Sequence, residues 1–209
     1  ALAETGAQRV ALEETGKVLS IHQDHVGAVR LRGQLQRDMK QFDAAVAQYS
    51  RLISLGVYRQ EALTERAGIY FEQESWLQAT DDLTALLKID PNDPTLLRLR
   101  AIAYQEQELW PLAIADWTQL GLADNTNVEA LASRAVAFTE IGEVSAAISD
   151  YLSILRFQPG NHDAARKLSG LYAQLGQSQD AIAVLTSKAA GLLSPPPRGA
   201  SLSSRISAP

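Results

Sequence analysis

Apolar residues recur at steps of three and four positions along most of the chain, and no useful stretch alternates with period two. Steps of three and four place apolar side chains on one face of an α-helix, whereas alternation would indicate a strand. Local signals agree: Asp93 stands where it can cap a helix opened by Pro94, and Gly142 and Gly176 fall where left-handed turn residues are expected. The pattern predicts an all-α fold.

The helical pattern repeats every 34 residues, as in YFEQESW at 70–76 and YQEQELW at 104–110. A period of about 20–50 residues is the size of one structural repeat unit. Aligned without insertions, the chain gives five windows: 26–59, 60–93, 94–127, 128–161 and 162–195. The twentieth place is always alanine: Ala45, Ala79, Ala113, Ala147 and Ala181. A small residue there, and another at the eighth place, let two helices pack closely, so each window is predicted to form an antiparallel helix pair.

Within a window the residues resemble a tetratricopeptide repeat. One window matches the family at Leu131, Ala135, Phe138, Ala147, Tyr151 and Pro159, and another at Leu63, Ala67, Tyr70, Ala79 and Pro91. The chain departs from the family at Gln36, which replaces an aromatic residue, and in the last window, which lacks the proline. The resemblance implies a right-handed superhelical solenoid of antiparallel helix pairs.

The ends of the chain differ from the repeats. Residues 1–25 are expected to form an orphan helix, either a half-repeat or an N-terminal cap, because Ala11 stands at the alanine place of a second helix. Residues 26–191 hold the five repeats. Residues 192–209 are rich in proline and serine and are expected to form a flexible tail.

Charged residues keep fixed places in the windows. The seventh place holds Arg32, Arg66, Arg100, Arg134 and finally Leu168; the twenty-third holds Gln48, Asp82, Asp116, Asp150 and finally Val184. Because the acid disappears where the arginine does, we predict the ion pairs Arg66–Asp82, Arg100–Asp116 and Arg134–Asp150 across the two helices of a repeat. A ladder of arginines facing a ligand is the alternative.

Composition argues against several functions. The formal net charge is −5, so no general attraction to nucleic acid or anionic lipid is expected, and no apolar run approaches the length of a membrane span. The chain has no cysteine and three histidines, no Gly-rich phosphate loop and no nucleophile motif. We expect no enzyme activity, no catalytic residues, no cofactor and no metal site; a pair formed by His22 and His25 would lack further ligands.

The resemblance also implies a binding surface, because the family commonly binds a peptide or a partner helix in the concave groove lined by first helices. Here that groove would be lined by Arg30, Gln34, Thr64, Gly68, Phe71, Arg98, Ile102, Gln105, Val136 and Thr139. The family's clamp for chaperone carboxylates is not expected, because its lysine and asparagine places hold Arg30, Gln34, Glu65, Thr95 and Leu99.

Four acids at the thirteenth place form an expected acidic rim: Asp38, Glu72, Glu106 and Glu140. They stand near helix C-termini, where the helix dipole disfavours negative charge, which indicates a basic and apolar partner segment or simply a solvated helix end. The chain's own tail, with Arg198 and Arg205, is one candidate segment. We predict a non-enzymatic scaffold or adaptor that binds another protein. The alternatives are a homo-oligomeric subunit associating through its terminal repeat, and a regulatory domain of a larger protein.

Overall fold

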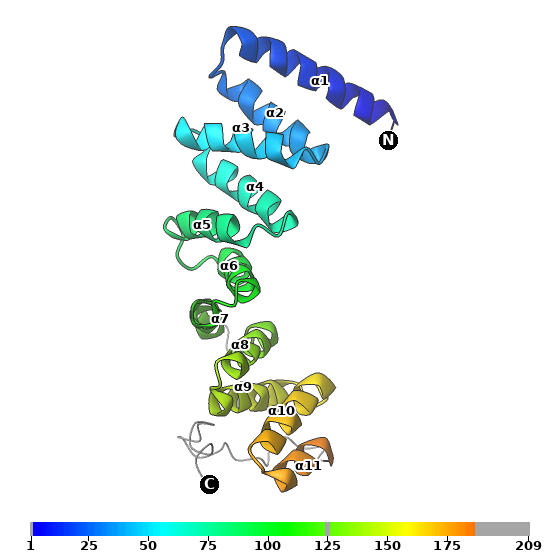
Figure 1. The fold of residues 1–209 in the computed structure, drawn as a ribbon, viewed down its shortest axis with the longest axis vertical. Coiled ribbons are helices and arrows are strands. Elements are labelled where there is room, and N and C mark those ends of the chain that lie inside the picture. The colour runs from blue at the N-terminus through cyan, green and yellow to red at the C-terminus, as the bar shows by residue number, and fades with distance from the viewer. Residues whose placement is uncertain (1, 124–125, 187–209) are drawn as a thin grey trace, which may run out of the picture. The chain divides into compact units, whose positions relative to one another are not determined.

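The computed structural model describes residues 2–123 and 126–186, and within these residues every regular element is a helix (Figure 1). In chain order the helices are α1 (Leu2–Ile21), α2 (Val26–Asp38), α3 (Phe42–Ser54), α4 (Arg59–Glu72), α5 (Trp76–Leu87), α6 (Pro94–Glu106), α7 (Trp110–Ala123), α8 (Val128–Glu140), α9 (Val144–Phe157), α10 (His162–Gln174) and α11 (Ser178–Thr186). The predicted all-α class is confirmed. The predicted tail, residues 192–209, lies outside the described residues.

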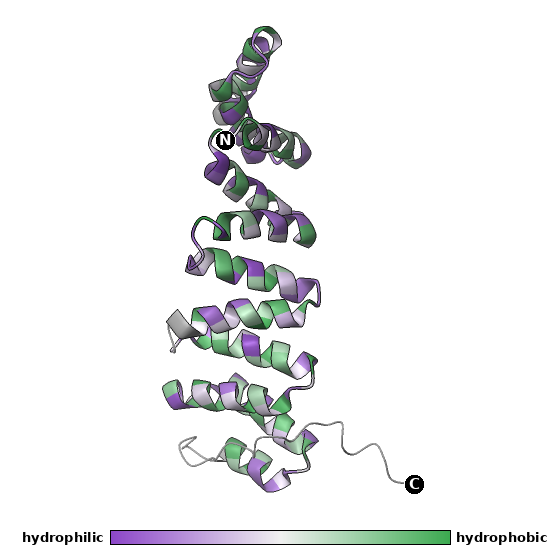
Figure 2. Ribbon diagram, turned by 90° about the vertical axis from the view of Figure 1, so that its left-hand side faces the viewer, coloured by the Kyte–Doolittle hydropathy of each residue, from purple (hydrophilic) through white to green (hydrophobic). Residues whose placement is uncertain are grey.

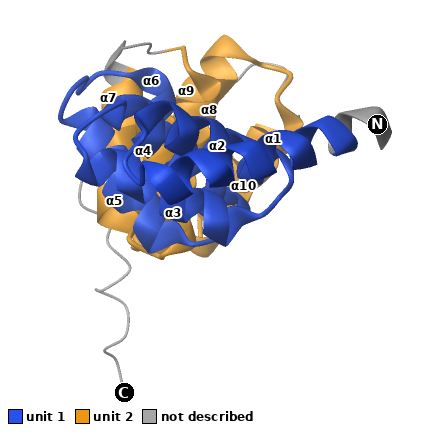
Figure 3. Ribbon diagram, turned by 90° about the horizontal axis from the view of Figure 1, so that it is seen from above, with its two compact units in different colours: residues 1–96 blue, residues 97–209 orange. Residues whose placement is uncertain are grey.

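Two compact units, residues 1–96 and 97–209, divide the chain within α6 (Figure 3). In the first unit each of α1 to α4 packs against the helix that follows it in sequence. In the second unit the same holds for α7 to α10. Short connections between helices that pack together produce the antiparallel pairs that the sequence predicts.

Five tight turns join the two helices of a repeat, and each has a left-handed residue at the same place. These residues are Lys40, Glu74, Glu108, Gly142 and Gly176, with φ between 50° and 80° (56°, 55°, 57°, 79° and 75°). In each turn the next amide nitrogen bonds back to the carbonyl five residues earlier, as Ser75 N does to Tyr70 O at 2.8 Å. This arrangement satisfies the last carbonyls of the first helix. Gly142 and Gly176 confirm the prediction, whereas the other three adopt a conformation that suits glycine better.

Side chains at the helix starts satisfy amides that have no partner inside the helix. Asp93 Oδ1 accepts hydrogen bonds from Thr95 N and Leu96 N at 2.8 and 3.0 Å, which confirms the predicted cap. Asn127 and Asn161 cap α8 and α10 in the same way. His25 caps α2, because its Nδ1 accepts a hydrogen bond from Ala28 N at 3.1 Å. That contact gives His25 a structural role.

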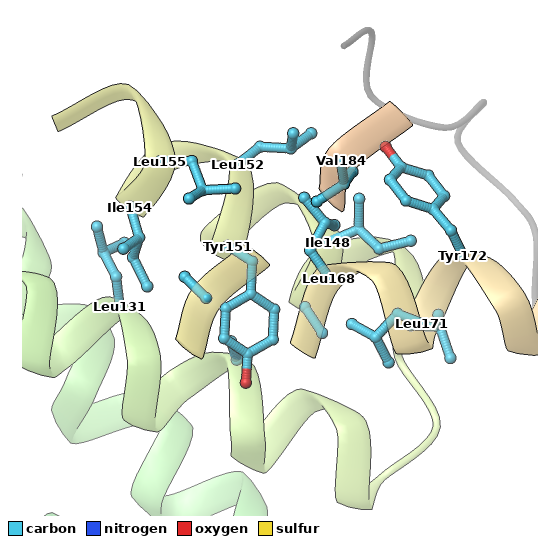
Figure 4. Close-up of a cluster of buried hydrophobic side chains, with 14 of the residues drawn as sticks. Leu131, Ile148, Tyr151, Leu152, Ile154, Leu155, Leu168, Leu171, Tyr172 and Val184 are labelled. Atoms are coloured by element: carbon cyan, nitrogen blue, oxygen red, sulfur yellow. The ribbon is translucent and has the colours of Figure 1, made fainter. Parts of the chain in front are cut away.

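Hydrophobic and hydrophilic residues are interspersed along the helices (Figure 2), and buried apolar side chains from neighbouring helices form the core of each unit. The alanines of the twentieth place are buried, four of them with no exposed surface (Ala45, Ala79, Ala113 and Ala147). In the second unit a large cluster around Ile148, Tyr151 and Leu168 joins α8, α9, α10 and α11 (Figure 4). Close contact at alanine and dense packing around it hold each helix pair together.

Candidate functional site

The three predicted ion pairs are confirmed, and each joins the two helices of one repeat. Arg66 donates to both carboxylate oxygens of Asp82 at 2.8 and 2.6 Å. Arg100 and Asp116 repeat this geometry at 2.8 and 2.7 Å, as do Arg134 and Asp150. The aspartates are buried, and hydrogen bonding to them raises the pKa of each arginine against the opposing effect of burial. These arginines are structural, and the alternative of a ligand-facing ladder is not supported.

Arg66 and Arg134 each bind a third side chain, a hydroxyl, and so form a three-residue bridge that the residue spacing did not predict. Arg66 Nη1 donates to Ser50 Oγ at 2.7 Å, and Arg134 Nη1 donates to Thr118 Oγ1 at 3.2 Å. Both hydroxyls stand at the twenty-fifth place of the preceding repeat. One arginine therefore links three successive helices: α3, α4 and α5 in the first unit, and α7, α8 and α9 in the second.

Between the last two repeats, apolar residues replace the hydroxyl, the arginine and the aspartate of the three-residue bridge. The equivalent residues are Leu152, Leu168 and Val184, which lie together in the core of the second unit (Figure 4). The sequence could have revealed the third partner, because the hydroxyl, the arginine and the acid are all absent from the same pair of repeats. In the first repeat, where Gln48 stands at the acid place, Arg32 instead donates to Leu12 O at 2.7 Å and so links α1 to α2.

In the first unit, the predicted groove residues already have partners within the protein. Arg30 Nε donates to Glu61 Oε1 at 2.7 Å, and its guanidinium lies over the ring of Tyr58. Gln34 reaches the same glutamate oxygen at 3.5 Å. Phe71 packs edge-on against Trp76, with ring centroids 5.3 Å apart. Thr64 is exposed and bonds back to its own helix.

Arg37 fills the space beside Gly68 on this face. Its guanidinium pairs with Glu65 and lies 3.9 Å from Glu72, and a Cβ added at Gly68 would meet Arg37 Nη2 at 3.3 Å. A long cation thus occupies the volume that the glycine leaves. The repeat spacing did not predict that Arg37 would lie over Gly68.

In the second unit, three predicted groove residues lie on α6. Arg98 lies 3.6 Å from Glu129, and Ile102 is half-buried. Gln105 Oε1 accepts a hydrogen bond from Trp117 Nε1 at 2.9 Å, and Trp117 is almost fully buried. Trp117 is therefore part of the packed core of its repeat.

The other two predicted groove residues, Val136 and Thr139, line a pocket of about 380 Å³ between α8 and α10. With them, α8 contributes Glu140 and α9 contributes Tyr151. The wall from α10 consists of Arg166, Lys167, Gly170, Leu171 and Gln174. The volume falls within the range of about 300–1,000 Å³ that is usual for ligand pockets.

This pocket lies where the equivalent space in the first unit is filled. Gly170 on α10 holds the same place in its repeat as Gly68 on α4, and Thr139 on α8 holds the place of the longer Arg37 on α2, in the preceding repeat. A Cβ added at Gly170 would meet no atom within 4 Å. The open volume is therefore a property of this part of the array, and sequence spacing alone did not reveal it.

Tyr151 supplies a polar atom to the lining of the pocket. The residue is 3% exposed, and no described residue forms a hydrogen bond with its hydroxyl, which points out of the labelled apolar cluster (Figure 4). Burial, together with Asp163 and Asp150, raises its pKa to about 12. The hydroxyl therefore stays protonated at neutral pH and can donate a hydrogen bond.

The four acids of the expected rim are each the last residue of a first helix, in α2, α4, α6 and α8. All four are exposed. Arg37 lies beside Glu72, and Glu140 borders the pocket. The rim as a binding surface stays a prediction.

Among residues 2–123 and 126–186, no group of three or more histidine, aspartate or glutamate side chains is arranged to hold a metal ion. No helix in the same ranges is both long and apolar enough to cross a bilayer.

Comparison with known proteins identifies the repeat. A family model described as tetratricopeptide repeat matches residues 30–94. The suspected resemblance is confirmed. No curated protein sequence matches the chain significantly.

Solved structures show the same tetratricopeptide-type solenoid over more of the chain. A crystal structure of MamA is 18% identical, with a TM-score of 0.63, over 73% of this chain and 89% of its own. YrrB, described as a TPR protein with an unusual peptide-binding site, is 17% identical, with a TM-score of 0.64, over 83% and 90%. The first TPR of Spaghetti (RPAP3), bound to the HSP90 peptide SRMEEVD, is 26% identical, with a TM-score of 0.50, over 56% and 93%. These likenesses establish the fold.

Proposed function

We propose that this protein is a non-enzymatic scaffold that binds a segment of a partner protein between the first helices α8 and α10. The observation that carries the proposal is the pocket of about 380 Å³ lined by Val136, Thr139 and Gly170. Apolar side chains with a few converging polar groups are the usual lining of a binding pocket. Among solved structures of this fold, YrrB has a peptide-binding site and the RPAP3 repeat holds a peptide, which supports a peptide as the ligand class.

The first-unit part of the predicted groove supports the proposal less. Arg30 and Arg37 form ion pairs across neighbouring helices there, with Glu61 and Glu65. A ligand that used these arginines would first have to replace their present partners. The pocket around Gly170, in contrast, needs no rearrangement of the described side chains before a ligand side chain enters it.

The test is to select peptides from a displayed random library on the purified protein and on two variants. Gly170→Phe fills the pocket from a helix whose backbone accepts the change, since phenylalanine has a higher helix propensity than glycine. Gly160→Phe adds the same ring at an exposed turn where the new side chain also meets no neighbour. Peptides should be enriched on the wild type and on Gly160→Phe, and lost on Gly170→Phe. Absence of enrichment, or equal binding to Gly170→Phe, would refute the proposal.

A second candidate function is self-association through the last repeat. On α11, the last described helix, Ile182 is 61% exposed and Leu185 is 62% exposed. Sedimentation over a range of protein concentrations tests it, with Leu185→Glu as the variant that should remain monomeric. A wild type that stays monomeric at every concentration would exclude this candidate.

A further inference from the structure

The pocket between α8 and α10 has opposite charges at its two ends. Arg166 and Lys167 border it from the first half of α10, and Glu140 borders it from the last residue of α8. By the 34-residue register, Lys167 is level with Ser133, seven residues before Glu140. At 1.5 Å per helical residue the two charges lie roughly 10 Å apart along the helices.

Other charges near the positive end do not cancel it. Asp163 lies one turn before Arg166 and pairs with it, with both side chains well exposed. An exposed pair of this kind is weak and leaves its partners free to exchange. Lys167 forms no ion pair with any described residue. The positive end therefore has a cation available for a ligand.

Between the charged ends the pocket lining is partly apolar. Val136 and Leu171 contribute apolar surface, and no described residue forms a hydrogen bond with the hydroxyl of Tyr151, which lines the same pocket. A hydroxyl in a largely apolar site gains a hydrogen bond when an acceptor reaches it. A main-chain carbonyl of a bound segment is such an acceptor.

We infer that the segment bound here carries a large apolar residue between an acidic and a basic residue, with the acid facing Lys167 and the base facing Glu140. This inference rests on the proposed function and specifies its ligand. In an extended segment each residue spans about 3.3 Å, so the acid and the base stand about three positions apart.

Segments with only one sign of charge fit this pocket less well. A purely basic segment would meet Arg166 and Lys167, and a purely acidic one would meet Glu140. Residues 192–209 contain two arginines and no acid, so they supply only the basic half. Like charges brought together at a binding surface oppose binding and thereby select the partner.

The first part of the test uses the peptides selected on the wild type, synthesised and titrated by calorimetry. Those that require an open Gly170 should contain an acid and a base flanking an apolar residue. Lys167→Glu and Glu140→Lys should each weaken binding by at least about tenfold, whereas Arg156→Glu, an exposed charge change on α9, should not. Tyr151→Phe should weaken it by about two- to tenfold, the value of one hydrogen bond.

The second part reverses both charges. Lys167→Glu combined with Glu140→Lys should bind the same peptide with its acid and base exchanged, and should reject the original peptide. Selected peptides without the charge pair, binding insensitive to the charge reversals, or tighter binding of a peptide of residues 192–209 would overturn the inference. In each of those outcomes pocket-dependent peptides still exist, so the proposed function stands; absence of any such peptide refutes the proposed function instead.

Discussion

Replacing Arg134 with leucine should lower the free energy of unfolding of the second unit, because it removes the partner of the buried Asp150 carboxylate. Arg134→Leu leaves the Asp150 carboxylate, with its side chain 7% exposed, without either of its hydrogen bonds at 2.8 and 2.7 Å. Breaking a buried pair in this way typically costs about 3–5 kcal/mol. We therefore expect Arg134→Leu to lower the free energy of unfolding by about 3–5 kcal/mol. Urea unfolding followed by circular dichroism at pH 7 measures the loss.

The chain itself provides the matched control. The triple variant Thr118→Leu, Arg134→Leu, Asp150→Val reproduces Leu152, Leu168 and Val184 of the next step. Because apolar replacement of a whole buried pair is often neutral or stabilising, the triple variant should lie within about 1 kcal/mol of wild type or above it. A loss below about 1 kcal/mol for Arg134→Leu at pH 7, or a triple variant as unstable as the single one, would refute the reasoning.

Glu108→Gly should raise stability by about 0.5–1 kcal/mol, because Glu108 has φ of 57°; an unchanged or lower unfolding midpoint in urea would contradict this. Ala113→Leu should cost about 1–3 kcal/mol at a fully buried contact, whereas the exposed Ala115→Leu should cost much less, so equal melting temperatures would count against the assigned helix contact. Burial raises the pKa of Tyr49 and Tyr151 to about 12, so folding stability should hold below about pH 10 and then fall by about 1.4 kcal/mol per pH unit for each tyrosine. Tyrosinate absorbance near pH 10, before the helices unfold, should be the same in Tyr49→Phe and Tyr151→Phe as in the wild type, and a decrease in either variant would contradict the last prediction.

The helix pairs and the ion pairs could be predicted because both depend on spacing. The 34-residue register brings Arg66 and Asp82 to facing places of two helices, and their joint loss at Leu168 and Val184 exposes the pairing. The hydroxyl of Ser50 belongs to the preceding repeat, so it becomes visible only when contacts between repeats are considered.

The pocket could not be predicted, because it depends on how far side chains reach. Gly68 and Gly170 hold the same place in their repeats, yet one is covered by Arg37 and the other is left open beside Thr139. Whether a long side chain bends over a glycine depends on its partners, here Glu65 and Glu72. Residue types at single places do not carry that information.

The three-residue bridge also limits how such a gene can change by recombination. A repeat with a hydroxyl at the twenty-fifth place, as at Thr118, accepts a following repeat with arginine at the seventh place. A repeat with leucine at that place, as at Leu152, accepts a following repeat with leucine at the seventh place. Duplicating the module 94–127 would join hydroxyl to arginine again and preserve every bridge. Deleting 128–161 would place Thr118 against Leu168 and leave a hydroxyl in an apolar contact. Modules of this array can therefore be copied within the arginine-bearing series, but the last one can follow only its own predecessor.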